Sequence, residues 1–222
     1  MPEIISTNQT LKSPRLPAEW EPHEATWIGW PHNKSDWPGK FRAIPNVYAE
    51  IVKHLSGSEK VYILVQSKEH KIKAEQLLKR ANADINNVKF FKKKTNRGWV
   101  RDSGPFFVKE KDIIIGVDFK FNAWAKYGDY KLDDKIPQFI SKRLKLESVV
   151  AEYNGKKVVL EGGSIDVNGK GTLITTEECL LDQKLQVRNP GLTKQDYFQI
   201  FKKYFGITNV IWLGKGIIGD DT

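Results

Sequence analysis

Apolar residues along the chain follow two spacings that alternate with one another. Short apolar runs bounded by polar residues and glycines predict β-strands, and apolar residues that recur every three or four positions predict amphipathic helices. Strands are expected at residues 61–65, 88–91, 106–108, 113–117, 149–150, 158–160, 171–175 and 210–213, and helices at 47–55, 68–80, 133–144 and 194–205. Strand pairs thus alternate with single helices, roughly every 60 to 70 residues, which predicts an α/β array of similar units.

The last of these helices has the clearest pattern in the chain. Thr193 is a suitable N-cap, and Gly206 follows the final apolar position. Between them, apolar residues lie at the spacing of one helical face. Residues 20–37 are different, because tryptophans and prolines are interspersed there, and we expect loop or short strand.

Composition excludes several classes of protein. No segment among the 222 residues approaches the roughly 20 consecutive apolar residues of a membrane-spanning helix. The single cysteine, Cys179, excludes an internal disulfide and a zinc cluster built on cysteines. The first ten residues do not show the basic and then apolar pattern of a signal peptide, so we expect a cytoplasmic protein.

The charge balance leaves a second class of partner open. Lys and Arg number 36 against 27 Asp and Glu, a formal net charge of +9, which permits nucleic-acid binding. Lysines are spread along the whole chain, however, and the densest run, 92–94, has no arginine cluster beside it. This pattern favours a solvated surface, with a nucleic-acid-binding module as the alternative.

The first segment with candidate chemistry is 96–105, where Trp99, Arg101 and Asp102 precede a Gly-Pro pair. If the segment is a regular strand, Trp99 and Arg101 share one face and Asp102 points to the other. A strand end with an ordinary ion pair is the alternative interpretation.

The second segment is 160–169, where Glu161 ends an apolar strand and two glycines follow. Glycines allow another backbone or a ligand to approach closely, and burial of a bare carboxylate is costly without a cation. The Asn-Gly pair at 168–169 predicts a hairpin turn, which is the structural alternative. A third segment, 214–222, is rich in glycine and ends with two aspartates.

The other reactive side chains carry weaker signals. Two glutamates precede Cys179 and two leucines follow it, which indicates a structural cysteine with a suppressed thiolate. The four histidines show no spacing typical of metal ligands.

Taken together, these segments resemble the agmatine deiminases and the related bacterial, Porphyromonas-type peptidylarginine deiminases. The resemblance runs from about Leu16 to the last residue, and its segments occur in the order found in that family. They are Trp20–Trp27, Trp30–Pro31, Trp99–Pro105, Phe121–Trp124, Glu161–Gly163, Thr175–Leu181, Arg188–Pro190 and Gly219–Thr222.

The resemblance implies a pentein fold, an α/β propeller of strand-strand-helix-strand modules around a pseudo-fivefold axis. We expect an incomplete ring of about three of the five modules. In this interpretation, residues 1–16 form a flexible N-terminal arm. Residues 17–222 form one partial catalytic domain without the C-terminal modules.

The resemblance also implies a reaction. A cysteine thiolate attacks the guanidinium carbon of agmatine, ammonia leaves, and water releases N-carbamoylputrescine on the route to putrescine, with no cofactor and no metal. Asp102 is then the catalytic carboxylate that binds the guanidinium. Trp99, Glu161 and Asp221 contact the substrate, Asp221 through the distal amine.

The chain departs from the family pattern in its C-terminal motifs. The histidine, the second aspartate and the nucleophilic cysteine of the family have no counterpart in residues 1–222, and Cys179 matches a different segment. We therefore expect no deiminase activity from this chain alone, and a complementary C-terminal chain or self-association as partner. The alternatives are a non-catalytic guanidino-binding or interaction protein, one half of a split enzyme, and a peptidylarginine deiminase.

Overall fold

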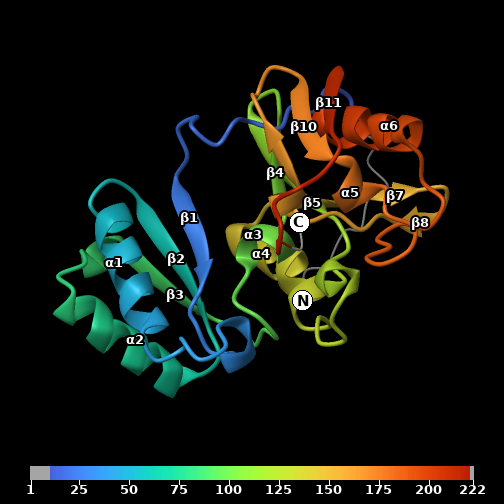
Figure 1. Ribbon diagram of the computed structural model, residues 1–222. Coiled ribbons are helices and arrows are strands. Elements are labelled where there is room, and N and C mark those ends of the chain that lie inside the picture. Colours follow the sequence, from blue (N-terminus) through green and yellow to red (C-terminus); the bar gives the residue numbers. More distant parts are fainter. Residues whose placement is uncertain (1–10, 221–222) are drawn as a thin grey trace. The chain divides into compact units, whose positions relative to one another are not determined.

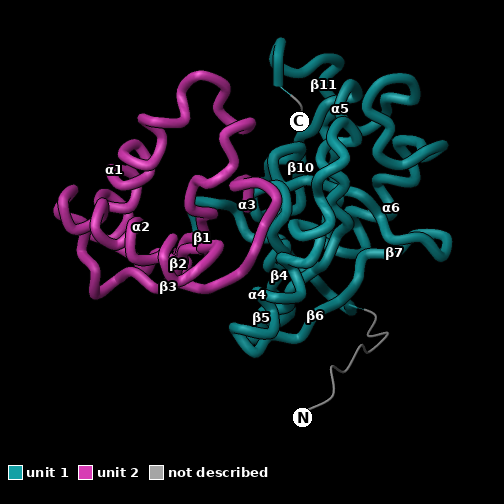
Figure 2. Tube along the Cα trace, turned by 90° about the horizontal axis from the view of Figure 1, so that it is seen from below, with its two compact units in different colours: residues 1–21, 101–222 teal, residues 22–100 magenta. Residues whose placement is uncertain are grey.

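The computed structural model describes residues 11–220 and contains several small β-sheets with helices packed against them (Figure 1). The chain divides into two compact units (Figure 2). Unit 2 is the continuous segment Pro22–Val100, and unit 1 holds the described residues on either side of it. The expectation of one domain over residues 17–222 did not anticipate this division.

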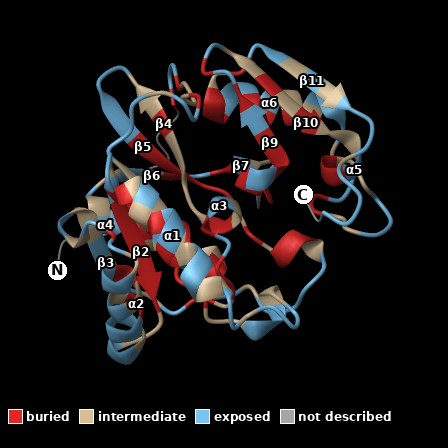
Figure 3. Ribbon diagram, turned by 60° about the vertical axis from the view of Figure 1, so that its left-hand side comes forward, coloured by how far each residue is buried: buried red, intermediate tan, exposed pale blue. Residues whose placement is uncertain are grey.

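Unit 2 is a three-stranded parallel sheet in which helices connect successive strands. The order along the chain is β1 (Ala25–Gly29), α1 (Ile44–Ser56), β2 (Lys60–Val65), α2 (Lys68–Arg80) and β3 (Val88–Lys92), with short 3-10 turns at Lys34–Asp36 and Ile85–Asn87. Strand β2 is central, and both of its neighbours run parallel to it. Alternate residues of β2, from Val61 to Val65, pack with Val52 of α1 and Leu78 of α2. Figure 3 shows β2 buried and the outer face of α1 exposed.

Unit 1 contains two segments with the same topology. The first is β4 (Phe106–Glu110), β5 (Ile113–Asp118), α4 (Ile136–Leu144) and β6 (Glu147–Val150), and the second is β9 (Ile165–Val167), β10 (Thr172–Thr176), α6 (Lys194–Phe205) and β11 (Asn209–Leu213). In each segment the first two strands form an antiparallel pair, and the fourth element pairs in parallel with the central strand. The strand-strand-helix-strand pattern therefore occurs twice in unit 1, whereas in unit 2 a helix separates the first two strands.

The remaining elements of unit 1 are short and connect these segments. They are α3 (Val100–Ser103), which begins at the end of unit 2, β7 (Glu152–Tyr153), β8 (Lys156–Lys157), α5 (Glu177–Leu180) and 3-10 turns at Ala123–Ala125, Asp133–Lys135 and Gly162–Ser164.

Helix α6 forms as its sequence predicts. The side chains of Thr193 and Asp196 make a reciprocal capping box, and Gly206 ends the helix in the left-handed conformation that glycine favours. The helix buries Tyr197, Phe201 and their neighbours in the largest core cluster of the described residues, against β5, β9 and β10.

Two local predictions are wrong. The segment around Asp102 is the short helix α3 rather than a strand, so the strand argument that placed Arg101 and Asp102 on opposite faces does not apply. The strand expected at 158–160 is replaced by β8 and one isolated bridge between Val159 and Lys120. The stretch after Trp20, predicted as loop or short strand, contains the five-residue strand β1.

The expected N-terminal arm is partly anchored. Residues 1–10 lie outside the described residues. From residue 11 onward, Leu11 packs into the core of unit 1, and Arg15 exchanges two backbone hydrogen bonds with Lys109 at 2.8 Å each. Leu16 donates a backbone hydrogen bond to Phe205. Residues 11–16 are therefore held against unit 1.

Within residues 11–220, none of the helices combines the length and the apolar character that crossing a bilayer requires.

Candidate functional site

A fully buried charged group of unit 1 is Glu161, which lies just before the 3-10 turn at 162–164. Its side chain is fully buried and faces Arg188, whose side chain is 1% exposed. The Arg188 Nε–H donates to both carboxylate oxygens of Glu161, at 3.1 Å and 3.0 Å. The sequence predicted that a buried Glu161 would need a cation beside it, and the guanidinium of Arg188 is that cation.

Arg188 and its neighbour Asn189 are both fixed by backbone contacts. Arg188 Nη1 donates to the carbonyl oxygens of Cys179 and Gln186, at 3.2 Å and 3.3 Å. The Asn189 amide group pairs with the backbone N–H and carbonyl of Val159 and donates to the Tyr197 hydroxyl. The loop after α5 is thereby joined to the segment that carries Glu161.

Two opposing effects act on the protonation of Glu161. Burial raises the pKa of Glu161 because a charged carboxylate loses its hydration, and the nearby Asp102 acts in the same direction. Arg188 opposes the rise through its charge and its hydrogen bonds. Removal of Arg188 would take away the main effects that oppose burial.

Asp102 lies beside this pair, on α3. Its Oδ1 accepts a hydrogen bond from the backbone N–H of Gly163 at 2.8 Å, and its carboxylate also interacts with the side chain of Trp124. Burial raises the pKa of Asp102, while the Gly163 N–H and the positive charge of Arg101 lower it. Asp102 is intermediate in exposure, whereas the side chain of Glu161 is fully buried.

A glycine at position 162 is required for this arrangement. A Cβ atom built on Gly162 would lie 2.3 Å from the carbonyl oxygen of Arg101, a distance that a real side chain cannot adopt. The close approach of the 161–163 segment to α3 is what lets Gly163 reach Asp102. Gly162 thus allows the segment that carries Glu161 to lie against the helix that carries Asp102.

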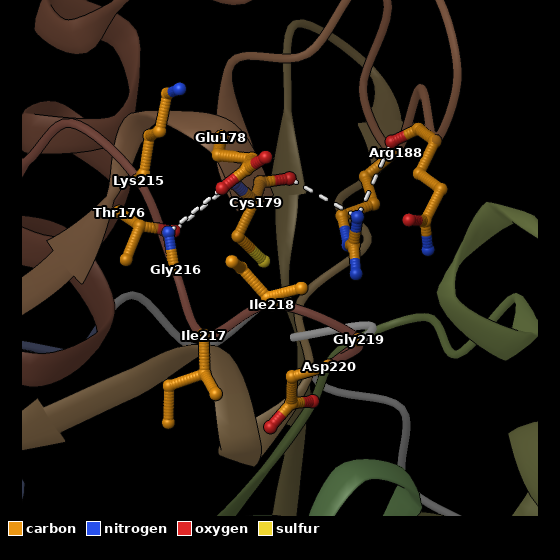
Figure 4. Close-up of a pocket in the computed structure, with 11 residues that line it drawn as sticks. Thr176, Glu178, Cys179, Arg188, Lys215, Gly216, Ile217, Ile218, Gly219 and Asp220 are labelled. Carbon is orange, nitrogen blue, oxygen red and sulfur yellow. Dashed lines mark hydrogen bonds between the residues drawn. The ribbon is translucent and has the colours of Figure 1, made fainter.

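A pocket of about 330 Å³ lies next to this group of residues (Figure 4). Its walls include Cys179, Gln186 and Arg188 on one side and the tail from Lys215 to Asp220 on the other. The Glu178 carboxylate accepts a hydrogen bond from the Gly216 N–H at 2.8 Å, which ties the tail to α5. In Figure 4 the Cys179 thiol points toward Ile218 of the tail.

Cys179 has the environment of a structural cysteine. The residue is 5% exposed, and burial raises the pKa of its thiol to about 12, with Glu161 and Asp102 contributing in the same direction. A thiol with this pKa is almost entirely protonated at neutral pH, and the thiolate is the nucleophilic form.

The other predicted residues are placed as follows. Trp99 belongs to unit 2, where it is 37% exposed and its ring lies 5.4 Å from the ring of Trp37. Asp221 lies outside the described residues. Among residues 11–220, no group of three or more His, Cys, Asp and Glu side chains could hold a metal ion.

Two residues that contribute to this site were missed from the sequence. Arg188 and Trp124 both lie in segments that carry the family resemblance, but their side chains meet Glu161 and Asp102 across long stretches of chain. The cost of burying Glu161 alone signalled that a cation was needed, without identifying which one.

Comparison with known proteins places these residues in a family. Residues 15–222 match the family model for Porphyromonas-type peptidyl-arginine deiminases. The chain belongs to this family.

Curated relatives of this chain include agmatine deiminases. One from Pseudomonas aeruginosa (strain LESB58) is 36% identical over 214 residues, which are 94% of this chain and 55% of that relative. One from Medicago truncatula is 34% identical over 231 residues, 98% of this chain and 58% of that relative. The chain therefore spans little more than half the length of the curated relatives it matches.

Solved structures give the same result for the fold. An agmatine deiminase of Enterococcus faecalis matches with a TM-score of 0.80 at 31% identity, over 92% of this chain and 54% of that one. A C. jejuni agmatine deiminase with substrate bound matches with a TM-score of 0.77 at 34% identity, over 92% and 57% of the two chains. The expected α/β fold of this family, with several sheets, is confirmed.

Proposed function

We propose that this chain supplies the carboxylate side of an agmatine-deiminase-type active site, with Asp102 as the group that binds the substrate guanidinium. The observation that carries the proposal is the position of Asp102, which is held by the Gly163 N–H and is intermediate in exposure. A guanidinium presents paired N–H donors in one plane, and a fixed carboxylate accepts them in pairs. The contact of Trp99 with the substrate, which the family resemblance implies, stays a prediction.

Glu161 has a different part in this proposal from the one its sequence suggested. Because its carboxylate is fully buried and bound by Arg188, direct contact with a substrate would require that pair to separate. We therefore propose that Glu161 contributes negative charge beside Asp102 rather than a first contact with the ligand. The proposed contact of Asp221 with the distal amine of agmatine falls on a residue outside the described part of the chain.

The chemical step requires groups other than those described above. In the family reaction a thiolate attacks the guanidinium carbon, and the thiol of Cys179 is buried with its pKa raised to about 12. We propose that Cys179 is not the nucleophile and that residues 1–222 alone release no ammonia from agmatine. A further polypeptide segment, in the same or another chain, would supply the nucleophile and the general base.

The ring architecture is part of the same proposal. The two strand-strand-helix-strand segments of unit 1 support modules of one kind, and the parallel sheet of unit 2 is proposed as a further, modified module. About three modules in 222 residues would leave two of a five-membered ring to that further segment.

The test is agmatine binding to the 222-residue chain, measured by isothermal titration calorimetry. We expect binding by the wild-type chain and at least about tenfold weaker binding by Asp102→Asn, since hydrogen bonds to a charged group contribute about 1.5–3 kcal/mol. Asp112→Asn, a change of the same type at an exposed turn of unit 1, serves as the control and should bind like the wild type. Equal affinity of Asp102→Asn and wild type would overturn the assignment.

Substrate class is tested in the same instrument. The names of the relatives favour agmatine over a peptidyl arginine, so agmatine is expected to bind more tightly than a short peptide with an internal arginine. Tighter binding of the peptide would favour the peptidylarginine alternative.

A further inference from the structure

The turn from Asn122 to Ala125 adopts a backbone conformation that its residues disfavour. Ala123, Trp124 and Ala125 have φ angles of 53°, 60° and 52°, three consecutive non-glycine residues in the left-handed region. Such residues normally occur singly, because the Cβ atom comes too close to the following carbonyl oxygen. Strained backbone of this kind persists only where surrounding contacts hold it, and it concentrates at functional sites.

Hydrogen bonds hold this turn from three directions. The Asn122 side chain accepts a hydrogen bond from the Ala125 N–H at 2.9 Å, within the turn. The Gln186 side chain donates to the Trp124 carbonyl oxygen at 2.9 Å, from the loop that also carries Arg188. The Asp134 carboxylate accepts from the Phe121 N–H at 2.9 Å, just before the turn.

The result of this bracing is a fixed position for the indole of Trp124. The residue is 6% exposed, and its ring packs edge-on against Phe121 at 5.2 Å and Tyr127 at 6.0 Å. Its side chain interacts with the carboxylate of Asp102 and lowers the pKa of that group. Because an indole can only donate a hydrogen bond, the polar group that it can offer to a carboxylate is its N–H.

We propose that Trp124 is a positioning residue for Asp102: the strained turn at 122–125 presents the indole N–H to the carboxylate while Gly163 holds it from the backbone. The proposal rests on the proposed function of Asp102 in guanidinium binding. Two donors from separate segments fix the plane of the carboxylate, and each oxygen keeps a lone pair for an incoming cation. The buried ring also keeps water away from one side of Asp102, which strengthens its attraction for a cation.

Trp124→Phe tests the proposal, because it keeps an aromatic ring and removes the N–H. Trp212→Phe is the matched control, since Trp212 packs against the same unit's Tyr197 and lies outside the group around Asp102. Two quantities are measured: the Asp102 carboxyl titration, followed by ¹³C NMR without ligand, and agmatine affinity by calorimetry. Asp102→Asn identifies the Asp102 signal and reports on the proposed function.

The expected result for Trp124→Phe is a higher pKa of Asp102 and about tenfold weaker agmatine binding. Trp212→Phe should leave both unchanged. Gln186→Met, which removes the donor to the Trp124 carbonyl without touching the indole, should raise the pKa of Asp102 in the same direction by a smaller amount. This variant decides the question if Trp124→Phe does not fold.

Two outcomes separate this inference from the proposed function. If Asp102→Asn abolishes agmatine binding while Trp124→Phe and Gln186→Met leave the affinity and the Asp102 titration unchanged, the positioning role is wrong and the function of Asp102 stands. If Asp102→Asn binds agmatine normally, the proposed function fails. A raised pKa of Asp102 in Trp124→Phe would then still establish the contact but not its role in binding.

Discussion

Replacing Arg188 with Met leaves Glu161 buried without its cation. We expect the free energy of unfolding to fall by an amount that depends on pH. The Glu161 side chain is fully buried and that of Arg188 is 1% exposed, so water cannot replace the lost donors in the folded state. The cheapest response is for Glu161 to take up a proton, since a bare buried carboxylate costs more. The free energy of unfolding then falls by the cost of that protonation.

The cost of protonating Glu161 depends on how far the pH lies above the pKa of a glutamate in the unfolded chain, which is about 4.3. Each pH unit above that value costs about 1.4 kcal/mol. The cost is about 3.5–4 kcal/mol at pH 7 and about 1 kcal/mol at pH 5. The value at pH 7 agrees with the roughly 3–5 kcal/mol typical of breaking a buried ion pair. A folded-state pKa raised above the unfolded value contributes stability that is present at low pH and lost as pH rises, so Arg188→Met should be most destabilised at neutral pH.

The assay is urea unfolding followed by circular dichroism at pH 5 and pH 7. The difference in the free energy of unfolding between the wild type and Arg188→Met should be smaller at pH 5 than at pH 7, by about 2–3 kcal/mol. The double variant Glu161→Gln/Arg188→Met has no titrating group at position 161 and should lose this pH dependence. Arg143→Met, at an exposed arginine of α4, is the control for the substitution itself. An equal loss of stability at both pH values would show that Glu161 does not take up a proton in the folded variant.

Two further predictions follow from the same region. Ala125→Gly should raise the melting temperature, because the φ of 52° costs an alanine about 1–2 kcal/mol that a glycine does not incur; an unchanged or lower value in scanning calorimetry would show that the turn is unstrained. Cys179 should react with iodoacetamide at pH 8 far more slowly in the folded chain than in urea, because it is buried and its pKa is raised to about 12; equal rates by mass spectrometry would contradict its assignment as structural.

Helix α6 shows which parts of the fold could be predicted from sequence. Its N-cap, apolar face and terminal glycine all indicate the same element, and the structure forms it between Thr193 and Gly206. The helix α3 shows the opposite case. It is four residues long, and a single turn of helix is too short to display the periodicity that distinguishes it from a strand.

The candidate site was predictable in its residue types and not in its pairings. Asp102 and Glu161 stood out by sequence, yet the pairing of Glu161 with Arg188 joins residues 27 positions apart through a loop, which local patterns do not encode. The left-handed turn at Trp124 had no signal at all, because alanine and tryptophan have no preference for positive φ. Tertiary contacts impose both features.

Titration of agmatine into the wild-type and Asp102→Asn chains measures whether Asp102 binds a guanidinium. We expect measurable binding by the wild type, retained in Asp112→Asn and at least about tenfold weaker in Asp102→Asn. Binding of agmatine with the same affinity by all three chains would contradict this expectation.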